Sequence, residues 1–197
     1  MIKRAFDLVC AALGLLLLSP LLLAVAIAIK LDSPGPVFFR QERIGRHGKP
    51  FRIHKLRSMT QRQSAQASQI TIGADARITR VGALIRRWKL DELVQLIDVF
   101  QGNMSLVGPR PEVPRYVALY PSDVASLVLS VRPGITDPAS IHFRNENELL
   151  GKAEDPEKMY RETILPEKLR LQSAYVREQS FFGDIAIILR TIASIGR

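Results

Sequence analysis

LVCAALGLLLLSPLLLAVAIAI, residues 8–29, is a run of 22 residues without a charge, and it decides how the rest of the chain is interpreted. As one continuous helix it would measure about 33 Å, which is enough to cross a hydrocarbon core of about 30 Å. The pair Ser19-Pro20 lies at its middle. Proline removes one helical hydrogen bond and crowds the preceding turn, so a kink is expected there. The Ser19 hydroxyl could satisfy a carbonyl that Pro20 leaves free.

Three interpretations of this run remain open from the residues alone. A cleaved signal peptide is possible, but its apolar core would normally be about 7–15 residues long. A single spanning helix is the simplest alternative. A re-entrant helix that returns to its starting face is favoured by basic residues at both ends, Lys3 and Arg4 before the run and Lys30 after it, because such residues prefer the cytoplasmic side.

The composition is that of a folded protein with an anionic partner. The 197 residues fit one domain, and 47% hydrophobic and 24% charged residues exclude wholesale disorder. The net charge is +9, and the first 60 residues hold 10 basic residues against 3 acidic ones. A basic segment beside an apolar anchor indicates contact with anionic lipid headgroups rather than nucleic acid. One cysteine and three dispersed histidines exclude a disulfide framework, a Cys-rich zinc site and a His-x-x-x-His metal helix.

The remaining pattern predicts a helix-dominated α+β domain with one small β-hairpin. Strands are expected over residues 37–41 and 50–57, around a turn at 45–49. Residues 61–70 are polar, without an apolar face, and predict a loop. Helices are expected over 79–100, 113–130, 156–179 and 181–195, with a short strand at 104–107 and a turn at 132–134. The last helix is apolar enough either to lie against lipid or to pack on the protein core.

Asp91 and Glu92 are the residues most suggestive of catalysis. Taken alone, adjacent acids on a helix usually form a solvated surface. Here they follow Arg86-Arg87-Trp88-Lys89 in a segment expected to be one helix, and such cations lower carboxylate pKa values and attract phosphate. An ionised aspartate can attack phosphorus. A neighbouring glutamate can help to hold Mg²⁺, which prefers one or two carboxylates plus substrate phosphates.

Pro109-Arg110-Pro111 is the second feature with chemical potential. Two prolines fix the backbone on either side of one arginine, which suits phosphate or nucleotide binding. A rigid turn with a solvent-facing arginine is the simpler alternative. Lys55 and Arg57, at the end of the second predicted strand, form a weaker cationic group. The sequence contains no P-loop, no dinucleotide glycine fingerprint and no Gly-x-Ser-x-Gly elbow, so those enzyme classes are disfavoured.

Together these segments resemble the monotopic polyprenyl-phosphate phosphoglycosyl transferases of the bacterial sugar transferase family. The matching stretches occur in family order over nearly all of residues 1–136. They are the Ser19-Pro20 helix and residues 33–45, 48–53, 55–59, 89–93, 102–112 and 132–136. The resemblance implies a small single-domain form. Residues 1–31 would be a re-entrant membrane helix broken at Ser19-Pro20. Residues 32–197 would be a cytoplasmic catalytic domain, seated by amphipathic interfacial helices on the inner membrane of a bacterium.

The resemblance also implies the reaction, which is transfer of a phosphosugar from a nucleotide-diphosphate sugar, usually a UDP-sugar, to undecaprenyl phosphate, with release of UMP. This would be the first membrane step of a bacterial surface glycan pathway. Asp91 would be the nucleophile that forms a phosphosugar-aspartyl intermediate, Glu92 would complete the dyad, and Mg²⁺ would bridge the dyad and the diphosphate. The groups expected to hold phosphates or the nucleotide are Lys55, Arg57, Arg86 and, in its turn with Pro109 and Pro111, Arg110.

Residues 137–146 depart from the family pattern, because Asp137-Pro138 follows Pro-Gly-Ile-Thr where many members have Gly-Trp-Ala-Gln. No role is predicted for this segment or for the C-terminal helices, and the sugar, the pathway and the oligomeric state stay open. The main alternative is a non-enzymatic basic membrane-associated protein that binds anionic lipids, for which Asp91 would be dispensable. An anchored nucleic-acid-binding protein is disfavoured, because the aromatic residues lie mostly in apolar runs rather than among Lys and Arg.

Overall fold

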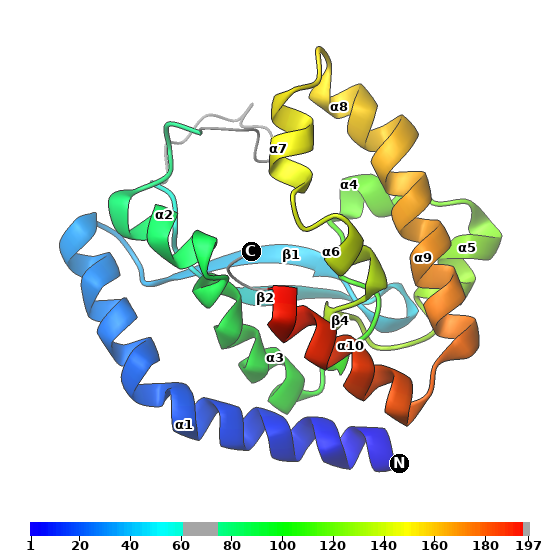
Figure 1. Cartoon of the computed structure of the whole chain (residues 1–197), viewed down its shortest axis with the longest axis horizontal. Coiled ribbons are helices and arrows are strands. Elements are labelled where there is room, and N and C mark those ends of the chain that lie inside the picture. The colour runs from blue at the N-terminus through cyan, green and yellow to red at the C-terminus, as the bar shows by residue number, and fades with distance from the viewer. Residues whose placement is uncertain (61–74, 195–197) are drawn as a thin grey trace.

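The computed structural model describes residues 1–60 and 75–194, so the loop predicted at 61–70 lies outside the described residues. The α-helices are α1 (Ile2–Asp32), α2 (Arg80–Arg87), α3 (Leu96–Gln101), α4 (Pro114–Val117), α5 (Ser122–Val128), α6 (Pro138–His142), α7 (Glu146–Gly151), α8 (Pro156–Met159), α9 (Leu165–Glu178) and α10 (Phe181–Ser194). The 3₁₀ helices are η1 (Arg46–Gly48) and η2 (Leu90–Gln95), and η3 (Tyr160–Ile164) is a π-helix. The strands are β1 (Phe38–Ile44), β2 (Pro50–Leu56), β3 (Ser105–Val107) and β4 (Gly134–Thr136). The predicted helix-dominated α+β class with a small hairpin is confirmed (Figure 1).

The apolar run forms α1, a long helix that is bent near its middle (Figure 1). Pro20 lies inside the helix and has no N–H to offer to the carbonyl of Leu16. The Ser19 hydroxyl donates to that carbonyl instead, over 2.7 Å. Most large apolar side chains of α1, such as Leu17 and Leu23, are exposed. Among the described residues, α1 is the one helix long and apolar enough to cross a membrane.

Both ends of α1 are tied to the same domain. Near the N-terminus, Lys3 Nζ donates to the carbonyl of Val107 at 2.9 Å. At the other end, the side chain of Asp32 accepts from the main-chain N–H of Val81 at 3.0 Å. The buried guanidinium of Arg57 donates to carbonyls of the last turn of α1 and the residues after it. The bend therefore allows the two ends of one long helix to contact one compact body.

The sheets are small, and they position loops rather than form a layer. β1 and β2 pair in antiparallel register, with Phe39 opposite Lys55, which confirms the predicted hairpin. β3 and β4 pair in parallel, although residues 132–134 were expected only to form a turn. A Cβ atom on Gly134 would lie 2.1 Å from the main-chain nitrogen of Gly108, so glycine permits the close approach of the first residue of β4 to the residue that follows β3.

The prediction of a continuous helix over 79–100 was wrong, because the chain turns at Lys89. The φ angle of Lys89 is 55°, in the left-handed region, so α2 ends before it and η2 begins after it. Apolar residues at helical spacing continue through this break, which is why the pattern did not reveal it. The predicted helix over 113–130 is likewise split into α4 and α5 at Tyr120-Pro121, since proline disfavours the helical conformation of the residue before it.

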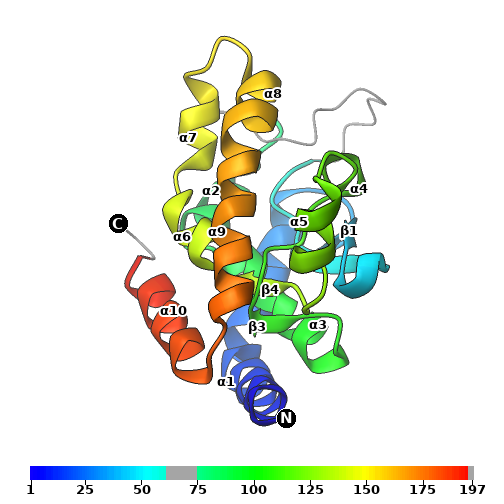
Figure 2. The same ribbon diagram turned by 90° about the vertical axis from the view of Figure 1, so that its right-hand side faces the viewer.

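Three apolar clusters hold the domain together, and α1 contributes to two of them. The first cluster joins α1 to β2, α2 and η2, and the second joins Ala11 to Ile53, Val99 and Met104. The third lies between α9 and the segment that contains α4 and α5. α10 begins beside α1 (Figure 2). There the rings of Phe6 and Phe181 meet edge to face, with their centroids 5.4 Å apart. Its apolar residues are only partly packed on the protein, because Phe182, Leu189 and Ile192 remain exposed.

Candidate active site

Asp91 and Glu92 lie in the first turn of η2, directly after the left-handed Lys89. Asp91 is only 2% exposed and the side chain of Glu92 only 15% exposed, so the pair is not a solvated helix surface. Because α2 ends before Lys89, a new helical turn starts after it. The side chains of Asp91 and Glu92 can therefore both be buried, although the two residues are adjacent in the chain.

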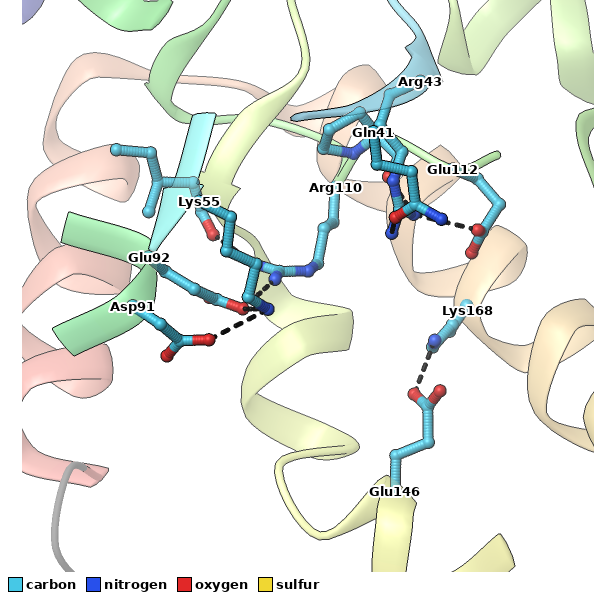
Figure 3. Close-up of polar contacts among 11 residues, drawn as sticks. Gln41, Arg43, Lys55, Asp91, Glu92, Arg110, Glu112, Glu146 and Lys168 are labelled. Atoms are coloured by element: carbon cyan, nitrogen blue, oxygen red, sulfur yellow. Dashed lines mark hydrogen bonds and ion pairs between the residues drawn. The ribbon is translucent and has the colours of Figure 1, made fainter. Parts of the chain in front are cut away.

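Two cations from separate elements meet the carboxylate pair (Figure 3). Lys55 Nζ, from β2, lies 3.2 Å from Asp91 Oδ2 and 3.1 Å from Glu92 Oε1. Arg110 Nη2, from the loop after β3, lies 2.5 Å from Glu92 Oε1. Asp91 Oδ1 is buried and has no hydrogen-bond partner among the described residues. Because an unpaired buried polar atom costs about 1–3 kcal/mol, this oxygen is free to bind a ligand group.

The charges of the site hold Glu92 in its ionised form. Burial alone raises the pKa of Glu92, but the positive charges of Arg110, Lys55 and Lys89 outweigh burial and hold that pKa well below its usual range. The charge of Glu92 in turn raises the pKa of Arg110. The site therefore keeps fixed charges at neutral pH, as an anionic substrate requires.

Asp137, for which no role was predicted, fixes the loop that carries Arg110. Its carboxylate is completely buried, and Oδ2 accepts from the main-chain N–H of Arg110 at 2.9 Å and from Gln172 Nε2 at 2.8 Å. Its Oδ1 accepts from the main-chain N–H of Ser140 at 2.6 Å and so caps the start of α6. Aspartate followed by proline is a typical start of a helix, and this signal in the sequence could have indicated the cap.

The other end of the same loop is held by the hairpin. Arg43 Nη1 donates to the carbonyl of Pro111 at 3.1 Å and to Glu112 Oε1 at 3.1 Å (Figure 3). The guanidinium of Arg110 is itself oriented by the carbonyl of Ile135, over 2.9 Å. Pro109 and Pro111 thus flank an arginine whose main chain and side chain are both fixed.

The structure does not bring Arg57 or Arg86 to the carboxylate pair. The buried guanidinium of Arg57 is used by the carbonyls of Ile29, Ser33 and Pro34, at 3.2, 2.6 and 3.0 Å. Arg86 lies in the last turn of α2, and within residues 1–60 and 75–194 no ion pair joins it to either acid. The expectation for Arg86 rested on helical spacing, which Lys89 interrupts. Of the predicted cations, Lys55 and Arg110 are the ones that reach the pair.

Asp91 and Glu92 are the residues that could hold a Mg²⁺ ion together with a substrate. In the part of the chain that the structure describes, no group of three or more His, Cys, Asp or Glu side chains is arranged to hold a metal ion. The protein therefore offers two carboxylates, one with a free buried oxygen. Mg²⁺ commonly takes one or two carboxylates and completes its coordination with substrate phosphates and water, so Asp91 and Glu92 would hold it.

Comparison with known proteins identifies a family for the chain. The model of the bacterial sugar transferase family matches residues 1–197. The chain is 40% identical over 195 residues to the UDP-glucose:undecaprenyl-phosphate glucose-1-phosphate transferase of Escherichia coli K12, covering 98% of this chain and 39% of that protein. It is 38% identical over 196 residues to the UDP-N-acetylgalactosamine-undecaprenyl-phosphate N-acetylgalactosaminephosphotransferase of Aeromonas hydrophila, covering 98% and 43%.

A shorter relative is matched over most of its length. The chain is 37% identical over 194 residues to the uncharacterized sugar transferase EpsL of Bacillus subtilis, covering 98% of this chain and 87% of that protein. The chain thus spans about two fifths of the first two relatives and most of the third. Since the family match extends over all 197 residues, the chain belongs to the bacterial sugar transferase family.

Proposed function

We propose that this protein transfers a phosphosugar from a UDP-sugar to undecaprenyl phosphate and releases UMP. The observation that carries the proposal is Asp91 Oδ1, a buried carboxylate oxygen without a hydrogen-bond partner among the described residues, beside a second carboxylate and two cations. The names of two relatives support the substrates, since they specify UDP-glucose or UDP-N-acetylgalactosamine as donor and undecaprenyl phosphate as acceptor.

The chemistry takes place in two displacements at one phosphorus. Asp91 Oδ1 attacks the phosphorus that carries the sugar, an O–P bond forms, and the bond from this phosphorus to the bridging oxygen breaks. UMP leaves with the electron pair, and Asp91 carries the phosphosugar as a mixed anhydride. A phosphate oxygen of undecaprenyl phosphate then attacks the same phosphorus, and the bond to Asp91 breaks. The carboxylate is restored, and the product is undecaprenyl-diphosphate-sugar.

The other residues reduce the charge repulsion between the carboxylate and the substrate. Lys55 and Arg110 offer positive charge to the diphosphate, and Glu92 keeps both of them directed at the site. When bound, Mg²⁺ supplies further neutralisation of the diphosphate. Asp137 holds the main chain of Arg110 in place before substrate binds. Binding therefore does not have to order this loop.

The same proposal includes a re-entrant placement of α1 in the inner membrane, with the domain on the cytoplasmic face. The bend at Ser19-Pro20, the attachment of both ends of α1 to one domain and the exposed apolar side chains support it. The exposed apolar residues of α10 extend the surface that lipid would cover. An acceptor phosphate at the level of the headgroups could then reach Asp91.

The decisive experiment is to trap the intermediate. The purified full chain in nanodiscs is incubated with a UDP-sugar and Mg²⁺ but without undecaprenyl phosphate. We expect about one equivalent of UMP and, by mass spectrometry, a peptide containing Asp91 that is heavier by the phosphosugar. Asp91→Asn keeps the shape of the side chain but is not a nucleophile, and it should give neither signal. Asp123→Asn, at an exposed position in α5, is the matched control and should behave like the wild type.

Two results would contradict the proposal. UMP release by Asp91→Asn above a few per cent of wild type, with contaminating wild type excluded, would remove Asp91 as the nucleophile. A wild-type protein that stays in the membrane but releases no UMP from any UDP-sugar would favour the non-enzymatic lipid-binding alternative.

A further inference from the structure

A groove of about 490 Å³ lies along β1 and is not used by the residues described so far. Its walls are Phe39–Glu42 on one side and Val113–Arg115 on the other, and we call it the strand-edge groove. Its volume is within the usual range for small-molecule sites, about 300–1,000 Å³. The cations at Asp91 would bind the diphosphate of a donor substrate, but they do not provide a binding site for its nucleoside.

The strand-edge groove adjoins the carboxylate site at Phe39. Phe39 pairs with Lys55 across the hairpin, and directly opposite residues of antiparallel strands project to the same face. Lys55 is also the residue that reaches Asp91 and Glu92. On the other wall, Val113 is the third residue after Arg110. A ligand with its diphosphate at Lys55 and Arg110 can therefore extend directly into this groove.

Arg43 joins the two walls. Its Nη2 donates to Gln41 Oε1 at 2.9 Å, and its Nη1 donates to the carbonyl of Pro111 at 3.1 Å. Figure 3 shows Gln41 and Arg43 at the loop that carries Arg110. The position of the strand edge is therefore fixed relative to the loop that holds the phosphate-binding arginine.

Phe39 provides an aromatic surface in this groove. It remains 37% exposed, next to cations that suit phosphate. Its neighbour Phe38 is similarly exposed, at 44%, but projects to the opposite face of the strand and meets the ring of His54 edge to face, with the centroids 6.2 Å apart. Aromatic side chains beside a cationic groove are the usual stacking platforms for nucleic-acid bases.

The free edge of β1 provides hydrogen-bonding groups in the same groove, at Glu42. The carbonyl of Val37 points toward the β2 side, where it accepts from Arg57, whereas the N–H of Ile44 points outward to Glu112. Because strand residues alternate, the N–H and C=O of Glu42 also point outward. Within residues 1–60 and 75–194 no main-chain hydrogen bond outside the ladder uses them. A donor and an acceptor side by side can bind polar groups of a nucleoside.

We infer that the strand-edge groove binds the nucleoside of a pyrimidine nucleoside diphosphate sugar, with the base stacked on Phe39 and other polar groups of the nucleoside toward the main chain of Glu42. This inference rests on the proposed function, because it takes the diphosphate to lie at Lys55 and Arg110.

The test measures nucleotide binding separately from turnover. UMP is titrated by calorimetry into the full chain in nanodiscs, for the wild type, Phe39→Ala and Phe38→Ala. Since base stacking on an aromatic side chain is worth roughly tenfold in affinity or more, Phe39→Ala should weaken UMP binding about tenfold. Phe38→Ala should stay within about twofold, since its ring lies on the other face. Ribose 5-phosphate, which has no base, should bind equally to all three proteins, and Phe39→Trp should bind UMP like the wild type.

The outcomes separate this inference from the proposed function. Unchanged UMP binding by Phe39→Ala, or an equal loss of ribose 5-phosphate binding, overturns the nucleoside assignment. So does a raised KM for undecaprenyl phosphate with intact UMP binding, because the groove would then hold the acceptor. If Asp91→Asn still abolishes turnover in these cases, only the inference fails. If the wild type neither binds UMP nor releases it from a UDP-sugar, both fail.

Discussion

Lys3 Nζ lies 2.9 Å from the carbonyl oxygen of Val107, although 104 positions separate the two residues in the chain. This hydrogen bond links the first turn of α1 to β3, the strand that precedes the loop of Arg110. Lys3 also forms an ion pair with Asp184 of α10, whose carboxylate accepts from the hydroxyl of Tyr175 at 2.8 Å. One buried carboxylate therefore joins α1, α9 and α10 beside the end of β3.

Lys3→Met is expected to lower the free energy of unfolding by about 2–4 kcal/mol, because it leaves the buried carboxylate of Asp184 without its cation. Chemical denaturation of the protein in detergent measures the change. Lys152→Met, at an exposed position without an ion pair among the described residues, is the control and should change stability by less than about 0.5 kcal/mol. The double variant Lys3→Met/Asp184→Asn should cost less than the sum of the single variants. Additive costs would show that the two residues do not interact in the protein.

Asp137→Ala is expected to destabilise the protein by about 2–4 kcal/mol, since it removes a helix cap and leaves the buried N–H groups of Arg110 and Gln172 without an acceptor. It should also raise the KM for the UDP-sugar more than it lowers kcat, because Arg110 would be held less well before substrate binds. Stability and steady-state kinetics of the same preparation provide both readouts.

Asp155→Ala is the matched control for Asp137. Asp155 caps α8 through one hydrogen bond of 2.9 Å to Lys158, far from Arg110 in the chain, and should cost about 1 kcal/mol with an unchanged KM. Asp137→Asn keeps one acceptor oxygen and should be intermediate. Equal effects of Asp137→Ala and Asp155→Ala on stability and on KM would show that Asp137 acts only as a helix cap.

Long and strongly patterned features of this chain could be predicted from the sequence. The apolar run predicted α1 and its kink, because a charge-free run interrupted by Ser19-Pro20 has few alternatives. β4 was not predicted, because its pairing with β3 depends on the close approach of Gly108 and Gly134, a tertiary contact that no local pattern reveals.

Part of the candidate site could also be predicted from the local sequence pattern. The preceding cations pointed to Asp91 and Glu92, the flanking prolines pointed to Arg110, and the structure places these three residues together with Lys55. Arg57 has the same chemistry as Arg110, but its partners are carbonyls at the end of α1, and only the tertiary structure decides between a carbonyl and a phosphate.

Removal of divalent cations is expected to abolish UMP release, and Mg²⁺ should restore it. Two carboxylates and a diphosphate are all anionic, and within residues 1–60 and 75–194 Lys55 and Arg110 are the two cations that form ion pairs with the acids. Glu92→Gln should raise the Mg²⁺ concentration needed for half-maximal activity, whereas Glu154→Gln, at an exposed position, should not. Full activity in excess chelator would mean that the two cationic side chains suffice.

Both ends of α1 are expected to face the cytoplasm. Single cysteines at the exposed positions 2 and 36, each in a Cys10→Ser background, should resist a membrane-impermeant thiol reagent in intact cells. Both should react once the cells are permeabilised, which is the control for accessibility. Labelling of position 2 from outside would establish a spanning helix.

Replacing Ser19-Pro20 by Ala-Ala should shift some molecules to that spanning form, because the run then becomes an uninterrupted helix of sufficient length. The shift is expected to be partial, since Lys3 and Arg4 would have to cross the membrane and abandon their contacts with Val107 and Val99. Adding Lys3→Met should therefore enlarge the externally labelled fraction, and UMP release should fall in proportion. If Ala-Ala leaves labelling and activity unchanged even with Lys3→Met, neither the proline nor this contact sets the topology, and the remaining contacts of α1 with the domain must do so.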